Sequence, residues 1–298
     1  MKFHDIINSR FGTILALWVG RSLPQRQGYW IAHQLGTVYG RSRRFAQTKA
    51  VRANQWVIHG GKLSKEELDR QTVATFRNGG RFLYDFYHNL RNPEVLLNMT
   101  EFEPSFLRYL DRCDKEPQLM VCPHVTNADL IGRAAALSGL KMQILSYPQP
   151  PGGYRLTNRI RAEAGMDITP MSVTALRQAT IRLQNNGTVL TGIDRPVQGS
   201  KYTPRFFGRP AALPVAHVRL ALKLGIPVIV ISGYLHPDGK YVVWASDPVA
   251  MRPDPDLQTE TVRNAEAILD VVAEAIRKVP DQWVMYYPLW PEALQEIP

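Results

Sequence analysis

Hydrophobic and polar positions follow two different patterns along this chain of 298 residues. In the first 110 residues, apolar positions recur at the three- and four-residue spacing of amphipathic helices. The pattern Ser64-x-x-Glu67 is a capping box, which predicts the start of a long helix. Gly79 and Gly80 interrupt that helix pattern, as at a close approach to another backbone.

From residue 118 onward, short apolar runs alternate with helical stretches. The predicted strands are residues 118–122, 142–147, 188–193, 227–232 and 241–245. The predicted helices are residues 128–138, 173–185, 215–224 and 259–278. This alternation predicts an α/β fold with a mixed, largely parallel sheet flanked by helices. The turn at residues 236–239 predicts that the strand after it runs antiparallel.

The chain shows no linker, repeat or low-complexity stretch, so we expect one domain over residues 1–298. Its helical N-terminal part would cover residues 1–110, and its α/β core residues 118–298. The proline-rich stretches at 148–153 and 252–256 are predicted to be loops inside that domain.

The composition limits which binding partners and which metal or disulfide chemistry the protein can have. Hydrophobic residues make up 45% and charged residues 21%, as in globular proteins. Cys113 and Cys122 form neither a disulfide framework nor a metal-ligand spacing, and we expect no metal and no cofactor. The net charge of +10 favours phosphates, which nucleic acid, anionic lipid or a phosphorylated carrier could supply. No zinc finger, RNP motif or arginine-rich tract supports nucleic acid as a partner.

The most apolar segment is residues 11–20, FGTILALWVG. Its length is half of the ~20 residues that a transmembrane helix needs, and no cleavage site of a signal peptide follows it. The segment is either an anchor lying in the membrane interface, with Trp18 at headgroup depth, or a first helix packed on the core.

The candidate catalytic residues lie between a predicted strand and the next helix. The chain lacks a G-x-S-x-G elbow, a Walker A loop, a G-x-G-x-x-G turn and an H-E-x-x-H pair. His124 follows the strand at 118–122, and Asp129 lies in the first turn of the next helix. A carboxylate that holds one imidazole nitrogen leaves the other free to take a proton. Alternatively, Thr126-x-x-Asp129 is only a capping box for the helix.

The spacing of His124 and Asp129 matches the H-x4-D/E motif of the lysophospholipid acyltransferase superfamily. The chain as a whole resembles the bacterial lipid A (lauroyl/myristoyl) acyltransferase family, which includes the mycobacterial phosphatidylinositol mannoside acyltransferases. The further stretches that carry this resemblance, in the family's order, are residues 68–89, 187–195, 206–211 and 280–283. Two stretches depart from the family pattern: residues 286–290 lack the basic pair of the tail, and residues 194–196 lack a second acid.

The resemblance implies a lysophospholipid acyltransferase-like fold and an O-acyltransferase associated with the cytoplasmic face of the cell membrane, peripheral or monotopic. The acyl chain would pass from acyl-CoA or acyl carrier protein to a hydroxyl of a lipid or glycolipid, without an acyl-enzyme. His124 would be the general base and Asp129 its orienting carboxylate. An anionic membrane surface would be a further partner.

The resemblance also implies a set of substrate-binding residues around this pair. Asp194 would line the same cleft, although aspartate is also common in turns. A basic position near residue 160, Arg159 or Arg161, would hold the site or a phosphate. The residues expected to bind substrate are Arg159, Arg161, Asp194, Arg195, Lys201, Arg205, Phe206, Phe207 and Arg209. The loop in which Lys201, Arg205 and Arg209 surround the two phenylalanines suits docking to anionic lipid or to a phosphopantetheine-linked donor, but its charges equally fit a solvated face. His217 on an apolar helix face fits a structural role.

Two other functions remain open on the sequence. A non-catalytic basic protein that binds membranes would explain the charge. A thioester hydrolase would use the same His124 with water as the acceptor.

Overall fold

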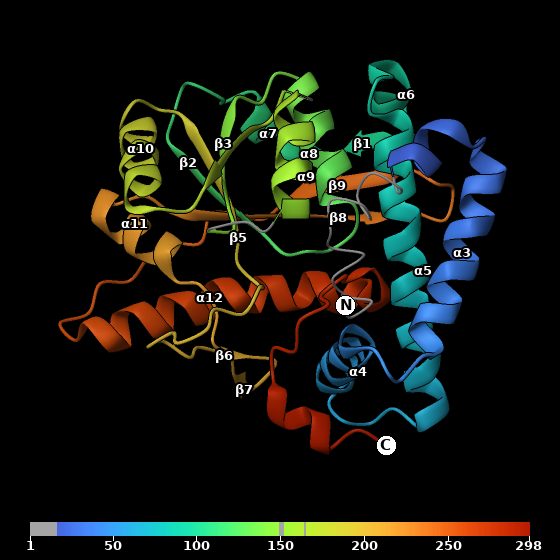
Figure 1. The fold of residues 1–298 in the computed structure, drawn as a ribbon. Helices are drawn as coiled ribbons and strands as arrows, with labels where there is room; N and C mark the ends of the chain where they lie inside the picture. Colours follow the sequence, from blue (N-terminus) through green and yellow to red (C-terminus); the bar gives the residue numbers. More distant parts are fainter. Residues whose placement is uncertain (1–16, 149–151, 164) are drawn as a thin grey trace.

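The computed structural model describes residues 17–148, 152–163 and 165–298. After a helical stretch at residues 17–22, five helices form the N-terminal part: α3 (Gln25–Arg41), α4 (Ala46–Ile58), α5 (Lys65–Asn89), α6 (Pro93–Asn98) and α7 (Pro104–Leu110). The predicted capping box at Ser64 is confirmed, because its side chain accepts from the backbone N–H of Glu67 while the Glu67 carboxylate accepts from the backbone N–H of Ser64. Figure 1 shows α3 and α5 side by side at one end of the molecule.

Helix α5 continues through Gly79 and Gly80, so the predicted interruption is wrong, whereas the predicted close approach is confirmed. A Cβ on Gly79 would lie 2.0 Å from the hydroxyl of Tyr286, and one on Gly80 would lie 3.0 Å from the carbonyl oxygen of Ala32. The two glycines therefore make room for the C-terminal segment and for α3.

The sheet has seven strands in the order β1-β9-β8-β2-β5-β3-β4. All neighbouring pairs are parallel except β8–β9, which is antiparallel as the turn at 236–239 predicted. The strands are β1 (Thr100–Phe102), β2 (Gln118–Cys122), β3 (Met142–Ser146), β4 (Asp167–Pro170), β5 (Thr188–Gly192), β8 (Val228–Leu235) and β9 (Tyr241–Ala245). The mixed α/β class with a helical N-terminal part is thus confirmed.

Helices cover both faces of the sheet and bury two hydrophobic cores (Figure 1). One core contains residues of α10 (Val173–Gln184), α11 (Ala216–Leu224) and α12 (Leu257–Lys278). The other contains residues of α5 and α7, of α8 (Ala128–Leu137) and of α9 (Gly152–Glu163). The remaining elements are the hairpin β6–β7 (Arg205–Phe206, Arg209–Pro210) and the 3-10 helices η1 (Pro280–Gln282) and η2 (Pro291–Gln295).

Strands β1 and β4 and the hairpin were not predicted. Each has two to four residues, too few to show an alternating pattern, and β1 and β4 lie at the two edges of the sheet. Most of the apolar segment at residues 11–20 lies outside the described residues; its last four residues are helical. Among the described helices, none has the length and hydropathy of a membrane span.

Candidate active site

The site lies where two central parallel strands end. Strands β2 and β5 pair in register, so that Cys122 stands opposite Gly192. His124 and Asp194 each follow two residues later and therefore leave the sheet at the same level. Carboxyl ends of parallel strands are where open α/β sheets place their ligands.

His124 and Asp194 form the central contact of the site. The Nδ1 of His124 lies 2.5 Å from Oδ1 of Asp194, and the backbone N–H of His124 donates to Oδ2 at 2.7 Å. The indole N–H of Trp283 donates to the same Oδ2 at 2.8 Å. Asp194 is 0% exposed, whereas the imidazole is 40% exposed. With Nδ1–H bound to the carboxylate, Nε2 is the nitrogen able to accept a proton from a substrate.

The electrostatics of the pair favour a charged imidazole. Burial opposes protonation, yet the charge and the hydrogen bond of Asp194 outweigh it and raise the pKa of His124. Burial would raise the pKa of Asp194, but the charge of His124 and the three hydrogen bonds lower it. The carboxylate therefore stabilises the imidazolium that forms on proton uptake.

The structure does not contain the expected contact between His124 and Asp129. Both residues belong to the described part of the chain, and no hydrogen bond joins them. Asp129 instead accepts two hydrogen bonds from Arg161, at 2.6 and 2.9 Å. The chain turns between the two residues, because Thr126 adopts a left-handed φ of 54°, and the carboxylate that reaches the imidazole comes from the strand alongside.

The capping-box alternative is wrong for this helix. Asn127 is the N-cap of α8, and its side-chain oxygen accepts from the backbone N–H of Leu130. Asp129 lies in the first turn of α8 and bonds Arg161, a residue of α9. The ion pair thus ties α9 to the start of α8 beside the site.

Two arginines lie close enough to His124 to act on its charge. Arg195 and Arg161 both oppose the protonation of His124 and hold its pKa below the value that Asp194 alone would give. Arg161 is largely buried, while Arg159, on the same helix, is exposed. The guanidinium of Arg195 lies over the rings of Tyr147 and Tyr287, 4.2 and 4.3 Å from their centroids.

The basic and aromatic residues 201–209, which were expected to bind substrate, do not form one exposed patch. Phe206 is buried between Trp283 and Trp290, and Phe207 packs on the same two rings. Arg209 forms a double hydrogen bond with Glu296. Lys201 and Arg205 are exposed. Phe206 therefore supports the indole that holds Asp194 instead of lining the cleft.

The backbone of the motif is held by the C-terminal segment. The N–H of Thr126 donates to the carbonyl of Gln282 at 2.8 Å, and the N–H of Val284 donates to the carbonyl of His124 at 3.0 Å. The amide of Asn127 donates to the carbonyl of Phe82 on α5. Residues far apart in sequence therefore fix the loop that carries His124.

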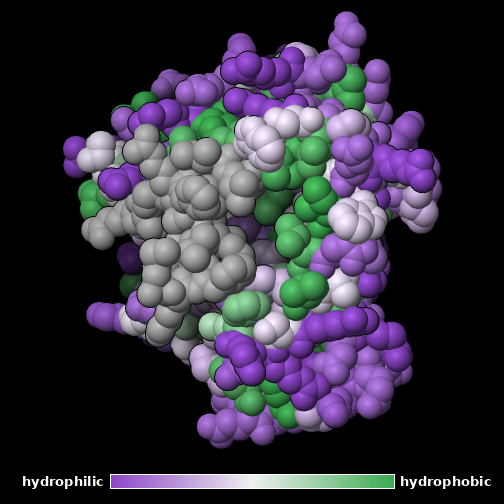
Figure 2. Space-filling model, turned by 45° about the vertical axis from the view of Figure 1, so that its right-hand side comes forward, coloured by the Kyte–Doolittle hydropathy of each residue, from purple (hydrophilic) through white to green (hydrophobic). Residues whose placement is uncertain are grey.

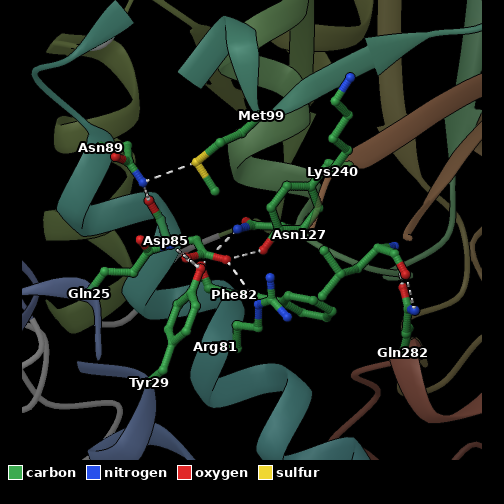
Figure 3. A network of polar contacts seen from close by, with 12 residues as sticks. Gln25, Tyr29, Arg81, Phe82, Asp85, Asn89, Met99, Asn127, Lys240 and Gln282 are labelled. Atoms are coloured by element: carbon green, nitrogen blue, oxygen red, sulfur yellow. Dashed lines mark hydrogen bonds and ion pairs between the residues drawn. The ribbon is translucent and has the colours of Figure 1, made fainter. Parts of the chain in front are cut away.

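A second polar centre lies next to that loop, around the buried Asp85 of α5 (Figure 3). Its carboxylate accepts from the hydroxyls of Tyr29 and Tyr241, at 2.7 and 2.5 Å, and pairs with Arg81 at 3.4 Å. Tyr241 also bonds Asn127. This centre gives no signal in the sequence, because an aspartate inside an amphipathic helix pattern does not reveal its buried partners.

An apolar cavity adjoins the motif beneath α8. Its empty volume is about 460 Å³, including space open to solvent. The lining begins at Cys122 and Pro123 next to His124 and reaches Leu140 and Met142. On α8 it follows residues 128 to 135, a rise of about 10 Å. The cavity therefore places an apolar surface beside the strand end that precedes His124.

Two other groups have pKa values that bear on chemistry. Burial raises the pKa of the Cys122 thiol to about 12, so it supplies no thiolate nucleophile at neutral pH. Burial lowers the pKa of His217 to about 4, which keeps that buried imidazole neutral. Among the described residues, no three His, Cys, Asp or Glu side chains gather as a metal site would require.

One comparison with known proteins identifies the family of this chain. A family model described as bacterial lipid A biosynthesis acyltransferase matches residues 6–292. The match includes the N-terminal helices as well as His124, Asp194 and Trp283, and it confirms the family resemblance inferred from the ordered motifs. A search of curated proteins finds no match to the chain.

Proposed function

This chain belongs to the bacterial lipid A biosynthesis acyltransferase family, and from that membership we propose the reaction in detail. A fatty acyl chain passes from the thioester of acyl-CoA or acyl carrier protein to a hydroxyl of a lipid or glycolipid. His124 is the general base, and Asp194 is the carboxylate that orients it. The single observation behind these roles is the bond between a buried Asp194 and a half-exposed imidazole.

The proton path follows from that bond. Nε2 of His124 takes the proton of the acceptor hydroxyl while the oxygen of that hydroxyl attacks the thioester carbonyl. The carbon–sulfur bond then breaks, and the imidazolium returns the proton to the leaving thiolate. No acyl-enzyme forms, in keeping with the raised pKa of Cys122. Arg161 and Arg195 supply positive charge for the oxyanion or for a phosphate of either substrate.

The acyl chain would lie against the apolar lining beneath α8, which starts at Cys122 and Pro123, next to His124 in the chain. An acceptor that is itself a lipid resides in a bilayer, and the enzyme must reach it there. We therefore place the protein at the cytoplasmic face of the cell membrane, as a peripheral or monotopic protein.

The proposal is tested with full-length His124→Ala and labelled acyl donors, acyl-CoA in one arm and acyl carrier protein in the other. With a total lipid extract as acceptor, wild-type protein should label a lipid, and the variant should lose about 10²- to 10⁴-fold in rate, the usual contribution of a general base. His236→Ala is the matched control, because His236 is an exposed histidine in the 236–239 turn.

Three results would overturn parts of the proposal. Free fatty acid as the sole labelled product would make the protein a thioester hydrolase. Wild-type rates in His124→Ala would remove His124 from the chemistry. A covalent acyl adduct on the protein would exclude the direct transfer.

A further inference from the structure

The excess of positive over negative charge lies in the N-terminal part of this protein. Residues 1–65 hold eleven lysines and arginines and a single acid, Asp5. The remaining residues, 66–298, carry 25 bases and 25 acids and are neutral as a group. The net charge of +10 therefore belongs entirely to the segment that contains α3 and α4.

Helix α3 packs on α5 by one face that lacks large side chains. A Cβ on Gly36 would lie 2.8 Å from the backbone of Arg77, and a Cβ on Gly40 would lie 2.8 Å from the Cα of Val73. The two backbones are thus in close contact along this seam. The inner face of α3 is therefore buried by close contact between backbones and not by large apolar side chains.

The large apolar side chains of α3 instead point outward. Trp30, Leu35 and Val38 are 64%, 65% and 68% exposed. At 100° per residue they lie within an arc of about 140°. Trp18, in the preceding helical stretch, is also exposed. Figure 2 turns this side of the molecule forward and shows hydrophobic residues gathered on it, with hydrophilic residues alongside.

Basic residues stand at both ends of this face. Arg26 lies in the first turn of α3, and Arg41 is its last residue; both are exposed. Single exposed apolar residues are common on protein surfaces, but three on one helix within an acid-free segment form a patch. Tryptophan suits the headgroup region of a bilayer, and arginine suits anionic headgroups.

We propose that the outward face of α3 docks the protein on an anionic lipid bilayer. The inference rests on the proposed function in so far as the acceptor is a membrane lipid. Trp30, Leu35 and Val38 enter the interface, while Arg26 and Arg41 meet the headgroup phosphates. The charge distribution selects this occupant, because an apolar protein partner or a second copy of the chain would not require +10 on one segment.

The test measures co-sedimentation of the full-length protein with vesicles of phosphatidylcholine, alone or mixed with phosphatidylglycerol. The triple variant Trp30→Ser, Leu35→Ser, Val38→Ser should partition at least about tenfold more weakly than wild type. Arg26→Gln and Arg41→Gln should each weaken binding to the anionic vesicles about fivefold, with little effect on the neutral ones. Raising the salt concentration should weaken wild-type binding.

Val173→Ser with Ile181→Ser is the matched control, because these exposed residues lie on α10 in the neutral part of the chain. Wild-type binding by the triple variant, or an equal loss in the α10 control, would overturn the inference. A changed oligomeric state of the triple variant in sedimentation, without a change in vesicle binding, would make this face a protein interface instead.

The two proposals fail separately. If vesicle binding depends on α3 but no acyl transfer is found, the docking face stands and the proposed function falls. If His124→Ala abolishes transfer while the triple variant binds vesicles like wild type, the function stands and the docking face falls. All the substituted α3 side chains are exposed, and the circular dichroism of each variant should match that of wild type.

Discussion

Asp194 and Asp85 are both fully buried, at 0% and 1% exposure, and both accept hydrogen bonds from aromatic side chains. Their pKa values nevertheless move in opposite directions. Burial raises the pKa of Asp85, and its tyrosines and Arg81 only partly oppose that rise. For Asp194 the charge and bonds of His124 outweigh burial, and the pKa falls.

The difference lies in what each carboxylate holds. Asp194 holds an imidazole that opens to solvent, and we propose that this imidazole exchanges a proton with the substrate. Asp85 joins Tyr29 of α3, Tyr241 of β9 and Arg81 of α5, and so ties three elements together. A buried aspartate thus acquires a chemical or a structural role from its partner and not from its burial.

The largest expected effect separates the two aspartates by activity. Asp194→Asn should reduce acyl transfer by about 10²- to 10⁴-fold, because the imidazole loses the carboxylate that fixes its tautomer and stabilises its charged form. Asp85→Asn should retain transfer within a few-fold per folded molecule. Initial rates with labelled donor check this, and equal losses in both variants would erase the distinction.

The second effect separates them by stability. Asp85→Ala leaves the buried hydroxyl of Tyr241, the half-buried hydroxyl of Tyr29 and Arg81 without their acceptor, and should lower the free energy of unfolding by about 3 kcal/mol. Arg81 is one third exposed, which keeps the cost near the lower end for a broken buried pair. Urea unfolding measures it; a loss under about 1 kcal/mol would show that the centre is dispensable.

The supporting aromatic residues provide a smaller contrast. Trp283→Phe removes one donor to Asp194, and Tyr241→Phe removes one donor to Asp85. Each should cost about 2 kcal/mol of stability, as hydrogen bonds to charged groups do. Only Trp283→Phe should also lower kcat/KM, by weakening the hold on Asp194. A fall in kcat/KM for Tyr241→Phe alone would reverse the assignment.

Stability should respond to pH with opposite signs at the two sites. The lowered pKa of Asp194 gives stability that is present above the unfolded pKa and lost as the pH falls through the folded one. The raised pKa of Asp85 gives stability that is present below the unfolded pKa and lost as the pH rises through the folded one. The destabilisation by Asp194→Asn should therefore shrink toward acid, and that by Asp85→Asn should grow. Urea titrations at several pH values test this.

The smallest effect concerns the pH profile of the reaction. The base must be neutral, so activity should fall as the pH drops through the raised pKa of His124. In Asp194→Asn that acidic limb should move to lower pH, because the main cause of the rise is gone. In Asp85→Asn the limb should stay in place. A limb that moves equally in both variants would show that it does not report His124.

The sequence analysis predicted the elements whose patterns are long and regular. Local periodicity is enough to predict the strands that begin at Gln118 and Tyr241, and local chemistry is enough to predict the capping box at Ser64. The structure contains all three features. The short edge strands escaped because pairing with a neighbour, not their own pattern, defines them. The register between strands that are distant in sequence could not be predicted either.

Because the register of strands β2 and β5 could not be read from the sequence, the carboxylate that contacts His124 was not identified there. His124 and Asp129 are five residues apart and invited a local pairing, whereas Asp194 lies seventy residues further along. Only the alignment of Cys122 with Gly192 brings Asp194 to the imidazole. The position of His124 at a strand end was predictable, since it follows from one strand and one helix. The spatial partners of Arg161 and Phe206 depend on side-chain packing that one sequence does not reveal.

The backbone around His124 is held by residues that are synthesised only after all seven strands of the sheet. The pairing of Thr126 with Gln282 and of Val284 with His124 closes only when the chain has grown past α12. A nascent chain that stops at residue 279 contains the base and its carboxylate but lacks Trp283 and the segment that grips the loop. The loop that carries His124 is therefore held in place only after the chain has grown past residue 284, and a product that stops earlier lacks part of the proposed site.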